Sequence, residues 1–528
     1  MILRITNNNL FILFFLLFLA LEVSGVSLYS VISFENNHVP IYDGVMYDYQ
    51  QIRRYESFRN DFSLLNRFNQ SIYEFRGNPI SGIYSAFLTF VSPSFLVSKW
   101  DVFIRSFIGV FLFAISFYLY FKNYLHEKWV LLLLALLFQL PYFYHYRTGL
   151  GSSVPELISA IYLMSGFLFI LSGVDRINVK YISFGLLIMF FSVLFRFNFF
   201  VYLILFSIPL FFVLINKWRF FSLYQRKRII LILSLFSLFF SAYISIYFSS
   251  FINYYIKGSY AFTTLSISFN FMVEIFKEYF GYVGIIICFV IIYGNLVFKK
   301  DNKLEKKQIT YLLLSFPFII FFSFIILYLK STNVPHIMSI MALLCTIAFV
   351  SLTFNFSYFS FSKRISLRMI GLVVVGLVFF NLYSIRSQRP IDQYISQKKV
   401  VSYLEYKLRK NPTLKFRCFY DSAIEIPIIS ALYVKSHILY PFQSVFNVQD
   451  VFYPKSINFH FNELVATLSD VDVVIINATS KNKLQIGDKA LVIQNKLRGY
   501  LQNKSKYRLM KIISSSYYSD LYVYEFIK

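Results

Sequence analysis

The chain has 528 residues, of which 57% are hydrophobic and 15% are charged. The apolar residues fall in blocks of roughly 20, the length that crosses a bilayer, so the composition excludes a soluble multidomain protein and indicates a polytopic membrane protein. The formal net charge of +25 does not indicate nucleic acid, because the cations lie mostly in short loops and in a polar tail, without a basic groove interleaved with aromatic residues.

The first apolar block runs from Leu10 to Val31 and is interrupted only by Glu22. Arg4 precedes this block, as a basic residue precedes the apolar core of a secretory signal peptide. However, the block is too long for the apolar core of a signal peptide, and no small-x-small cleavage site follows it. We therefore expect a retained signal anchor that leads into a polar loop at the membrane surface.

Eleven apolar spans are expected in all, and the distribution of Lys and Arg orients them. They lie at 10–31, 101–121, 129–143, 154–173, 181–195, 198–215, 229–250, 281–298, 309–329, 335–356 and 369–385. With a cytoplasmic N-terminus, most cations between spans fall inside, as the positive-inside rule requires. The segment 81–98, which contains Pro93, suits an interfacial helix better than a twelfth span.

The chain is expected to divide into two domains, and the odd number of spans determines on which side of the membrane the second one lies. A transmembrane domain, 1–386, carries a long first loop at 32–100, and a polar tail, 387–528, lies on the same non-cytoplasmic side. In the tail, β-type runs at 416–420, 471–476 and 521–526 alternate with helical patterns at 391–408 and 490–501. The tail is therefore expected to form a small soluble α/β domain.

An aspartate cluster, Asp43-Gly44-Val45-Met46-Tyr47-Asp48, opens the first loop. Together with about eleven helices and an external tail, it resembles the GT-C membrane glycosyltransferases. The stretch is similar to the Asp-Glu-x-x-Tyr stretch of the protein mannosyltransferases and the lipid A aminoarabinose transferases, except that Gly44 replaces Glu. The resemblance implies transfer of a sugar from a polyprenyl-phosphate donor to an acceptor outside the cytoplasm, with inversion expected.

The resemblance also implies that a first-loop aspartate is the base. A sugar hydroxyl is a poor nucleophile near neutral pH, and a carboxylate within hydrogen-bond reach can take its proton. Asp43 is the favoured base and Asp48 the second candidate. The alternative for both residues is a solvated loop carboxylate or a helix cap.

A lipid-phosphate leaving group needs cations at the external membrane face, because negative charge builds on it as the glycosidic bond breaks. The candidates in external loops are Arg53, Arg54, Arg147, Arg196, Lys330 and His336. Arg196 is preferred because its turn is very short and its flanks are apolar. Glu156, which opens the fourth span, is a candidate partner of Arg196 or an acceptor-binding acid. The alternatives are headgroup snorkelling for each cation and a helix N-terminal acid for Glu156.

No metal or other cofactor is expected. The six histidines and three cysteines are dispersed along the chain, which does not favour a metal cluster. The pattern Asp470-Val471-Asp472 runs directly into an apolar stretch, and it therefore indicates the start of a buried strand rather than a metal site.

Other functions remain open at this point. An O-antigen polymerase or ligase uses the same lipid-linked sugars. A lipid or solute transporter would place ionisable residues in mid-membrane, whereas the interiors of these spans are almost free of charge, with Arg105 as the main exception. A non-catalytic assembly protein would tolerate replacement of the aspartates. The resemblance to serotype-converting glucosyltransferases favours an acceptor in lipopolysaccharide O-antigen or another cell-envelope glycan, and a location in the bacterial inner membrane.

Overall fold

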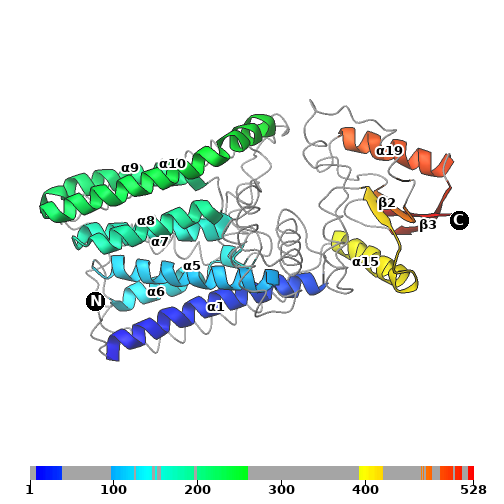
Figure 1. Ribbon diagram of the computed structural model, residues 1–528. Coiled ribbons are helices and arrows are strands. Elements are labelled where there is room, and N and C mark those ends of the chain that lie inside the picture. The colour runs from blue at the N-terminus through cyan, green and yellow to red at the C-terminus, as the bar shows by residue number, and fades with distance from the viewer. Residues whose placement is uncertain are drawn as a thin grey trace, which may run out of the picture.

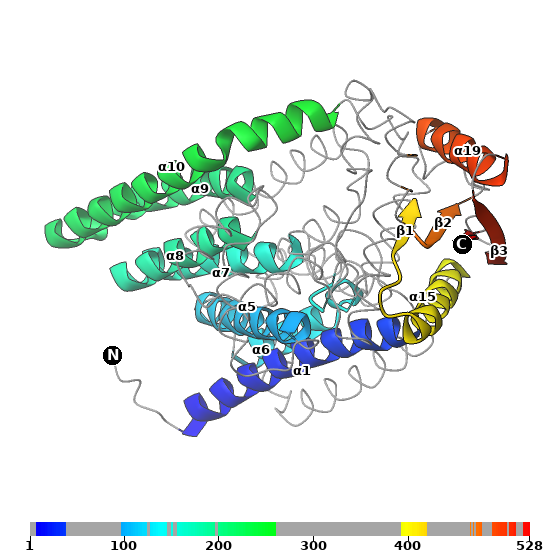
Figure 2. The ribbon, with the colours of Figure 1, turned by 45° about the vertical axis from the view of Figure 1, so that its right-hand side comes forward.

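The described part of the chain is mainly helical (Figure 1). The computed structural model describes residues 7–37, 97–123, 127–144, 149–151, 156–195, 199–259, 392–419, 471–477, 488–503, 506–513 and 521–527, together with Val465 and Leu468. Long apolar helices from the first half of the chain lie side by side. In two views that differ by 45°, the C-terminal elements lie beyond one end of these helices (Figure 2).

The bundle is built from seven of the described helices. They are α1 (Asn7–Asn37), α5 (Val97–Phe121), α6 (Glu127–Phe138), α7 (Glu156–Asp175), α8 (Val179–Phe195), α9 (Phe199–Lys217) and α10 (Leu223–Ser259). Five described stretches are long and apolar enough to cross a bilayer: Leu10–Ile32, Val102–Phe121, Leu157–Asp175, Tyr202–Phe220 and Leu223–Ser245. These helices indicate a membrane protein. The spans expected from 281 to 385 lie outside the described residues.

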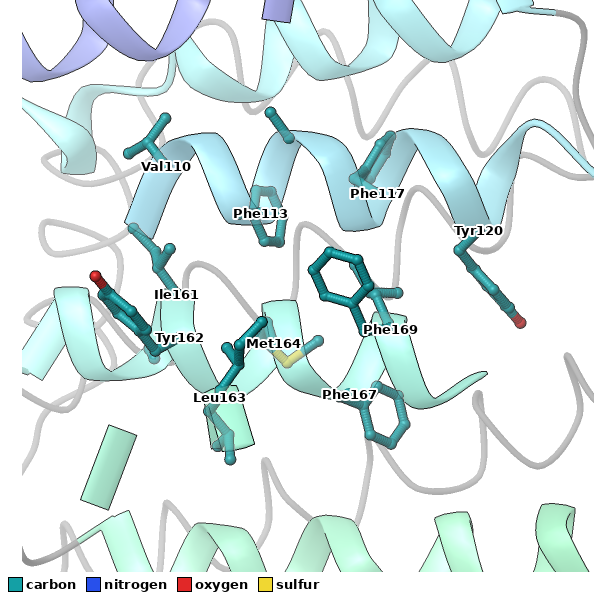
Figure 3. Packing of buried hydrophobic residues seen from close by; sticks show 14 of the residues in the cluster. Val110, Phe113, Phe117, Tyr120, Ile161, Tyr162, Leu163, Met164, Phe167 and Phe169 are labelled. Atoms are coloured by element: carbon teal, nitrogen blue, oxygen red, sulfur yellow. The ribbon is translucent and has the colours of Figure 1, made fainter. Parts of the chain in front are cut away.

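Helix α7 is the centre of this bundle. Its apolar stretch is fully enclosed, whereas most of the corresponding residues of α10 are exposed. Val110 and Phe113 of α5 and Ile161 of α7 belong to one buried cluster (Figure 3), and Phe113 also packs edge-to-face on Phe138 of α6, with ring centres 5.9 Å apart. A helix that is apolar on all sides suits this central position, because it has no polar face to expose.

Two glycines allow α7 and α8 to approach closely. A Cβ atom added at Gly166 would lie 2.4 Å from the carbonyl oxygen of Gly185, and one added at Gly185 would lie 2.6 Å from the carbonyl oxygen of Gly166. The backbones therefore touch where side chains are absent, as is common between membrane helices. The connection between them is short, and Ile177 adopts a left-handed conformation there, with a φ of 53°.

The predicted span 129–143 is only partly correct. Helix α6 ends at Phe138, and a 3-10 turn, η2 (Pro141–Phe143), follows. Pro141 has no N–H to donate to the helix and its ring would collide with the preceding turn, so the helix cannot continue through it. With 12 residues, α6 is shorter than a bilayer-crossing helix.

The C-terminal elements include a four-stranded sheet in the order β1-β2-β4-β3. Strand β1 (Phe416–Phe419) is parallel to β2 (Val473–Asn477), whereas β4 (Leu521–Phe526) is antiparallel to both β2 and β3 (Tyr507–Ile513). Strands β1, β2 and β4 occupy the three runs expected from the sequence. Strand β3 was not expected.

Each face of this sheet packs against one of the described helices. Val473 and Ile475 of β2 pack in the cluster that contains residues of α15 (Asp392–Lys410). Val474 and Ile476 pack in the cluster that contains residues of α19 (Asp488–Asn503). Since side chains alternate along a strand, an unbroken apolar run is expected where both faces are buried.

Candidate functional site

Most residues of the predicted site lie outside the described residues. These are Asp43, Asp48, Arg53, Arg54, Arg147, Arg196, Lys330 and His336. Glu156 is the first residue of α7, as expected from its place at the opening of the fourth span. Its role, and those of the other candidates, stay predictions.

The structure instead reveals a buried segment between α6 and α7, of which residues 139–144 and 149–151 are described and contain no α-helix. Gln139, Leu140, Tyr142 and Phe143 have no exposed surface, and Leu150 is almost fully buried. Backbone N–H and C=O groups need hydrogen bonds at membrane depth, and non-helical backbone is tolerated there only inside the protein or along an aqueous cavity. The segment therefore depends on partners from neighbouring helices.

Serine side chains of α1 and α5 supply these partners. The Ser27 hydroxyl donates to the carbonyl of Phe143 at 2.7 Å, and the Ser30 hydroxyl donates to that of Tyr144 at 2.9 Å. From α5, the Ser106 hydroxyl donates to the carbonyl of Leu150 at 2.9 Å. Two helices that are far apart in sequence thus hold the same segment.

Gly151 brings this segment into direct contact with the backbone of α1. Its N–H donates to the Ser27 hydroxyl oxygen at 2.6 Å. A Cβ atom at this position would lie 2.1 Å from the carbonyl oxygen of Ser27, which is far inside van der Waals contact. Only glycine fits here without a shift of the backbone.

A polar cluster surrounds Glu22, in the middle of the first apolar stretch. Gln139 donates through Nε2 to one carboxylate oxygen at 3.3 Å, and the Tyr144 hydroxyl lies 3.4 Å from the other. The same hydroxyl donates to the carbonyl of Phe138 at 2.8 Å. The sequence singles out Glu22 as a break in an apolar run, but its partners follow more than 110 residues later.

Arg105 is a second ionisable residue within the apolar helices. It lies near the start of α5, one residue before Ser106, and its exposed fraction is 2%. The Tyr162 hydroxyl of α7 donates to its backbone carbonyl at 3.4 Å. Ionisable groups inside membrane helices are costly and are generally functional. Glu22, Arg105 and the buried segment therefore define the candidate site.

The turns that are predicted to be cytoplasmic lie at the other end of the bundle, away from the buried segment. Arg176 donates through Nη2 to the carbonyl of Leu119 at 2.6 Å and to Asn123 at 3.2 Å. Gln225 donates through Nε2 to the carbonyl of Ile177 at 3.1 Å. The turns after α5, α7 and α9 therefore meet at one end of the bundle.

Like charges crowd at this end. Burial and the neighbouring Arg176 guanidinium lower the pKa of the Lys122 ammonium, while Glu127 partly offsets this effect. Helix α1 ends at Asn37, before the predicted first loop, and α5 begins at Val97, after it; both helices hold the buried segment through their serines. The two ends of the loop therefore lie together, away from the cationic turns.

Among the described residues, no group of three His, Cys, Asp or Glu side chains lies close enough to hold a metal ion. The chain matches none of the known protein-family models and none of the curated proteins with which it was compared.

Proposed function

We propose that the protein is a membrane glycosyltransferase of the GT-C type. It moves a sugar from a polyprenyl-phosphate donor to an acceptor outside the cytoplasm, such as lipopolysaccharide O-antigen or another cell-envelope glycan. The observation that carries the proposal is the aspartate cluster at the beginning of a long loop between two apolar helices. The proposal includes an inner-membrane location with an external α/β domain at 387–528.

The arrangement of the described helices supports this orientation. The predicted cytoplasmic turns lie together and are rich in Lys and Arg, while the two ends of the first loop lie away from them. Positive loops favour the cytoplasmic side, so the first loop would face outward. In both ribbon views, the described elements of the tail lie beyond the end of the bundle at which α1 and α10 terminate (Figures 1 and 2).

In the proposed reaction, Asp43 takes the proton of the acceptor hydroxyl as it attacks the sugar, with Asp48 as the second candidate. The glycosidic bond to the lipid phosphate breaks, and the phosphate leaves with the bond electrons. Arg196 is the preferred cation for that phosphate. Arg147, Lys330, His336, Arg53 and Arg54 are further candidates, and Glu156 would pair with Arg196 or bind the acceptor.

A transporter is the second candidate, and Glu22 and Arg105 favour it. Transporters place ionisable groups in the membrane interior, and both residues lie within stretches that are long and apolar enough to span it. Uptake or efflux in proteoliposomes without any sugar transfer would support this function over glycosyl transfer.

The aspartates provide the test of the main proposal. Asp43→Asn keeps the size of the side chain but cannot accept the hydroxyl proton, so transfer should fall by roughly 100-fold or more. The measurement is incorporation of labelled sugar from a polyprenyl-phosphate donor by membranes that contain equal amounts of each variant. Asp48→Asn is the matched control, and only the true base should lose turnover while still binding donor.

If both asparagine variants transfer sugar at the wild-type rate, the first loop does not supply the base and the proposed mechanism is wrong.

A further inference from the structure

A basic turn, Lys217–Arg228, joins α9 to α10. We propose that it is a binding site for the phosphate of an anionic phospholipid headgroup, of the phosphatidylglycerol kind. This inference goes beyond glycosyl transfer and does not depend on it. It also does not depend on which side of the membrane the turn faces.

The turn is held rigidly by its own side chains. The Ser222 N–H donates to the side-chain oxygen of Gln225 at 2.9 Å, and the Gln225 N–H donates to the Ser222 hydroxyl at 3.3 Å. This reciprocal pair is a capping box that begins α10. Gln225 also donates to the carbonyl of Ile177, which ties the turn to the neighbouring one.

One cation of the turn has a structural role. Arg226 donates through Nε to the carbonyls of Trp218 at 3.1 Å and Phe221 at 2.9 Å, and through Nη2 to that of Arg219 at 3.1 Å. The guanidinium thus satisfies two carbonyls of the 3-10 turn η3 (Trp218–Phe220) and the carbonyl of Phe221, which follows it. Arg226 is therefore not a candidate for binding lipid.

Three of the other four cations of the turn lie beside exposed aromatic rings. The Lys217 ammonium is 5.8 Å and the Arg219 guanidinium 4.9 Å from the ring centre of Phe220, whose exposed fraction is 51%. The Arg228 guanidinium is 4.3 Å from the ring centre of Tyr224, whose exposed fraction is 61%. Two cations thus flank one ring.

The protein supplies no carboxylate to this turn from the surrounding sequence. Between 176 and 273 the chain contains no Asp or Glu. Within the described residues, no carboxylate forms an ion pair with Lys217, Arg219 or Arg228. Like charges that are held close together repel, so an anion from outside the chain would be bound favourably.

The surroundings of the turn favour a lipid as the source of this anion. Phe211, Phe212 and Ile215, on the last turns of α9, have exposed fractions between 51% and 60% and continue the apolar surface away from the cations. Cations beside aromatic rings at the end of an apolar helix match the boundary between headgroups and acyl chains. A phospholipid can place its phosphate at Arg219 and its acyl chains along α9.

The test uses Trp218, which lies within the turn, as a reporter. The chain has three tryptophans, so a Trp100→Phe/Trp129→Phe background leaves only Trp218 to report. The full-length protein is placed in phosphatidylcholine nanodiscs that contain increasing amounts of brominated phosphatidylglycerol. Quenching of Trp218 fluorescence, compared with quenching by brominated phosphatidylcholine, measures the preference for the anionic lipid.

We expect a preference for phosphatidylglycerol that falls by about fivefold for each cation removed in Arg219→Gln and Arg228→Gln. Lys180→Gln is the matched control, because Lys180 is an exposed cation at the same end of the bundle but outside the turn, and it should keep the preference. Gel filtration checks that each variant is folded.

An equal preference in wild type and in the double variant Arg219→Gln/Arg228→Gln would overturn the proposal. So would release of the brominated lipid by inorganic phosphate at equal concentration, because the turn would then bind free anions rather than a headgroup.

Discussion

Glu22 has partners that only the folded chain brings to it. A hydroxyl carries one proton, and that of Tyr144 is taken by the carbonyl of Phe138 at 2.8 Å. The longer contact between Tyr144 and Glu22, 3.4 Å, is then satisfied best when the carboxyl group carries a proton. A neutral carboxylic acid also avoids the high cost of a charge at membrane depth.

A first prediction follows for Glu22. Glu22→Gln keeps the shape and the hydrogen-bonding capacity of a neutral acid, so it should change the free energy of unfolding by about 0.5 kcal/mol or less. Glu22→Lys places a fixed charge at the same position and should cost at least about 3 kcal/mol. Thermal unfolding of both variants in detergent measures the difference. Equal losses in the two variants would mean that the ionised carboxylate is required.

Tyr507, at the beginning of β3 in the C-terminal sheet, has a buried hydroxyl group. The Tyr507 hydroxyl lies 2.7 Å from the carbonyl oxygen of Leu468 and 2.5 Å from that of Val471, and its one proton is shared between these two acceptors. Burial, helped by the nearby Asp472 carboxylate, raises the pKa of Tyr507 to about 12 from a usual 10.0. Between these pH values the unfolded chain has lost the proton while the folded chain keeps it.

A second prediction concerns the pH dependence that follows from Tyr507. Because the unfolded state binds fewer protons in this range, stability should fall as the pH rises from about 10 towards 12. Tyr507→Phe should cost about 1 kcal/mol at neutral pH, since the two carbonyls lose the donor that they share, and should reduce the fall at high pH. Melting of the full-length protein across this range is the measurement. An unchanged pH dependence in Tyr507→Phe would assign it to other groups.

Element boundaries differ from the expected ones where a local constraint or a tertiary partner intervenes. Helix α6 stops before Pro141, although the apolar run continues. Strand β3 has no clear alternation of apolar and polar residues, because a β-bulge between Leu509 and Lys511 shifts the register and the strand lies at an edge of the sheet. By contrast, β4 coincides with the predicted run, 521–526, since it lies between β2 and β3 and its apolar side chains pack in the clusters on the two faces of the sheet.

A third prediction tests the close packing of α7 and α8. A Cβ atom at Gly185 would lie 2.6 Å from the carbonyl oxygen of Gly166 and 2.9 Å from the backbone nitrogen of Ile170, neither of which can move without moving α7. Gly185→Ala should therefore lower the free energy of unfolding by about 1–3 kcal/mol. Thermal unfolding in detergent measures this loss.

Gly25→Ala is the matched control for this prediction. No atom lies within 4 Å of a Cβ placed at Gly25 in α1, so alanine should be neutral or stabilising there, by up to about 1 kcal/mol. A Gly185→Ala variant as stable as Gly25→Ala would show that the two backbones are not in contact.

At the scale of the molecule, the described helix bundle has one cationic end and one end that holds the buried segment, the end of α1 and the beginning of α5. The serine bonds of Ser27 and Ser106 join α1 to α5 through that segment, while Arg176 and Gln225 join the turns at the other end. The packing thus gathers the Lys and Arg residues of the predicted cytoplasmic turns at one end of the bundle, and the positive-inside rule assigns such an end to the cytoplasmic side.

A fourth prediction concerns topology. A reporter fused after Lys528 should behave as external, and one inserted in the loop at Lys303 should behave as cytoplasmic, because an odd number of spans separates them and the loop is rich in Lys. Paired alkaline phosphatase and fluorescent protein fusions measure the two locations. A cytoplasmic tail would remove the shared external site and with it the proposed mechanism.

The sequence by itself determined the membrane class, the approximate positions of the helices from Leu10 to Ser245, and three of the four strands, because apolar periodicity and length are local properties. It also indicated that Asp472 precedes a buried strand, and β2 does begin at Val473. Only the tertiary structure decided which groups meet. The partners of Glu22 and the serine bonds to the segment after α6 depend on contacts between residues 44 to 124 positions apart, for which no local pattern exists.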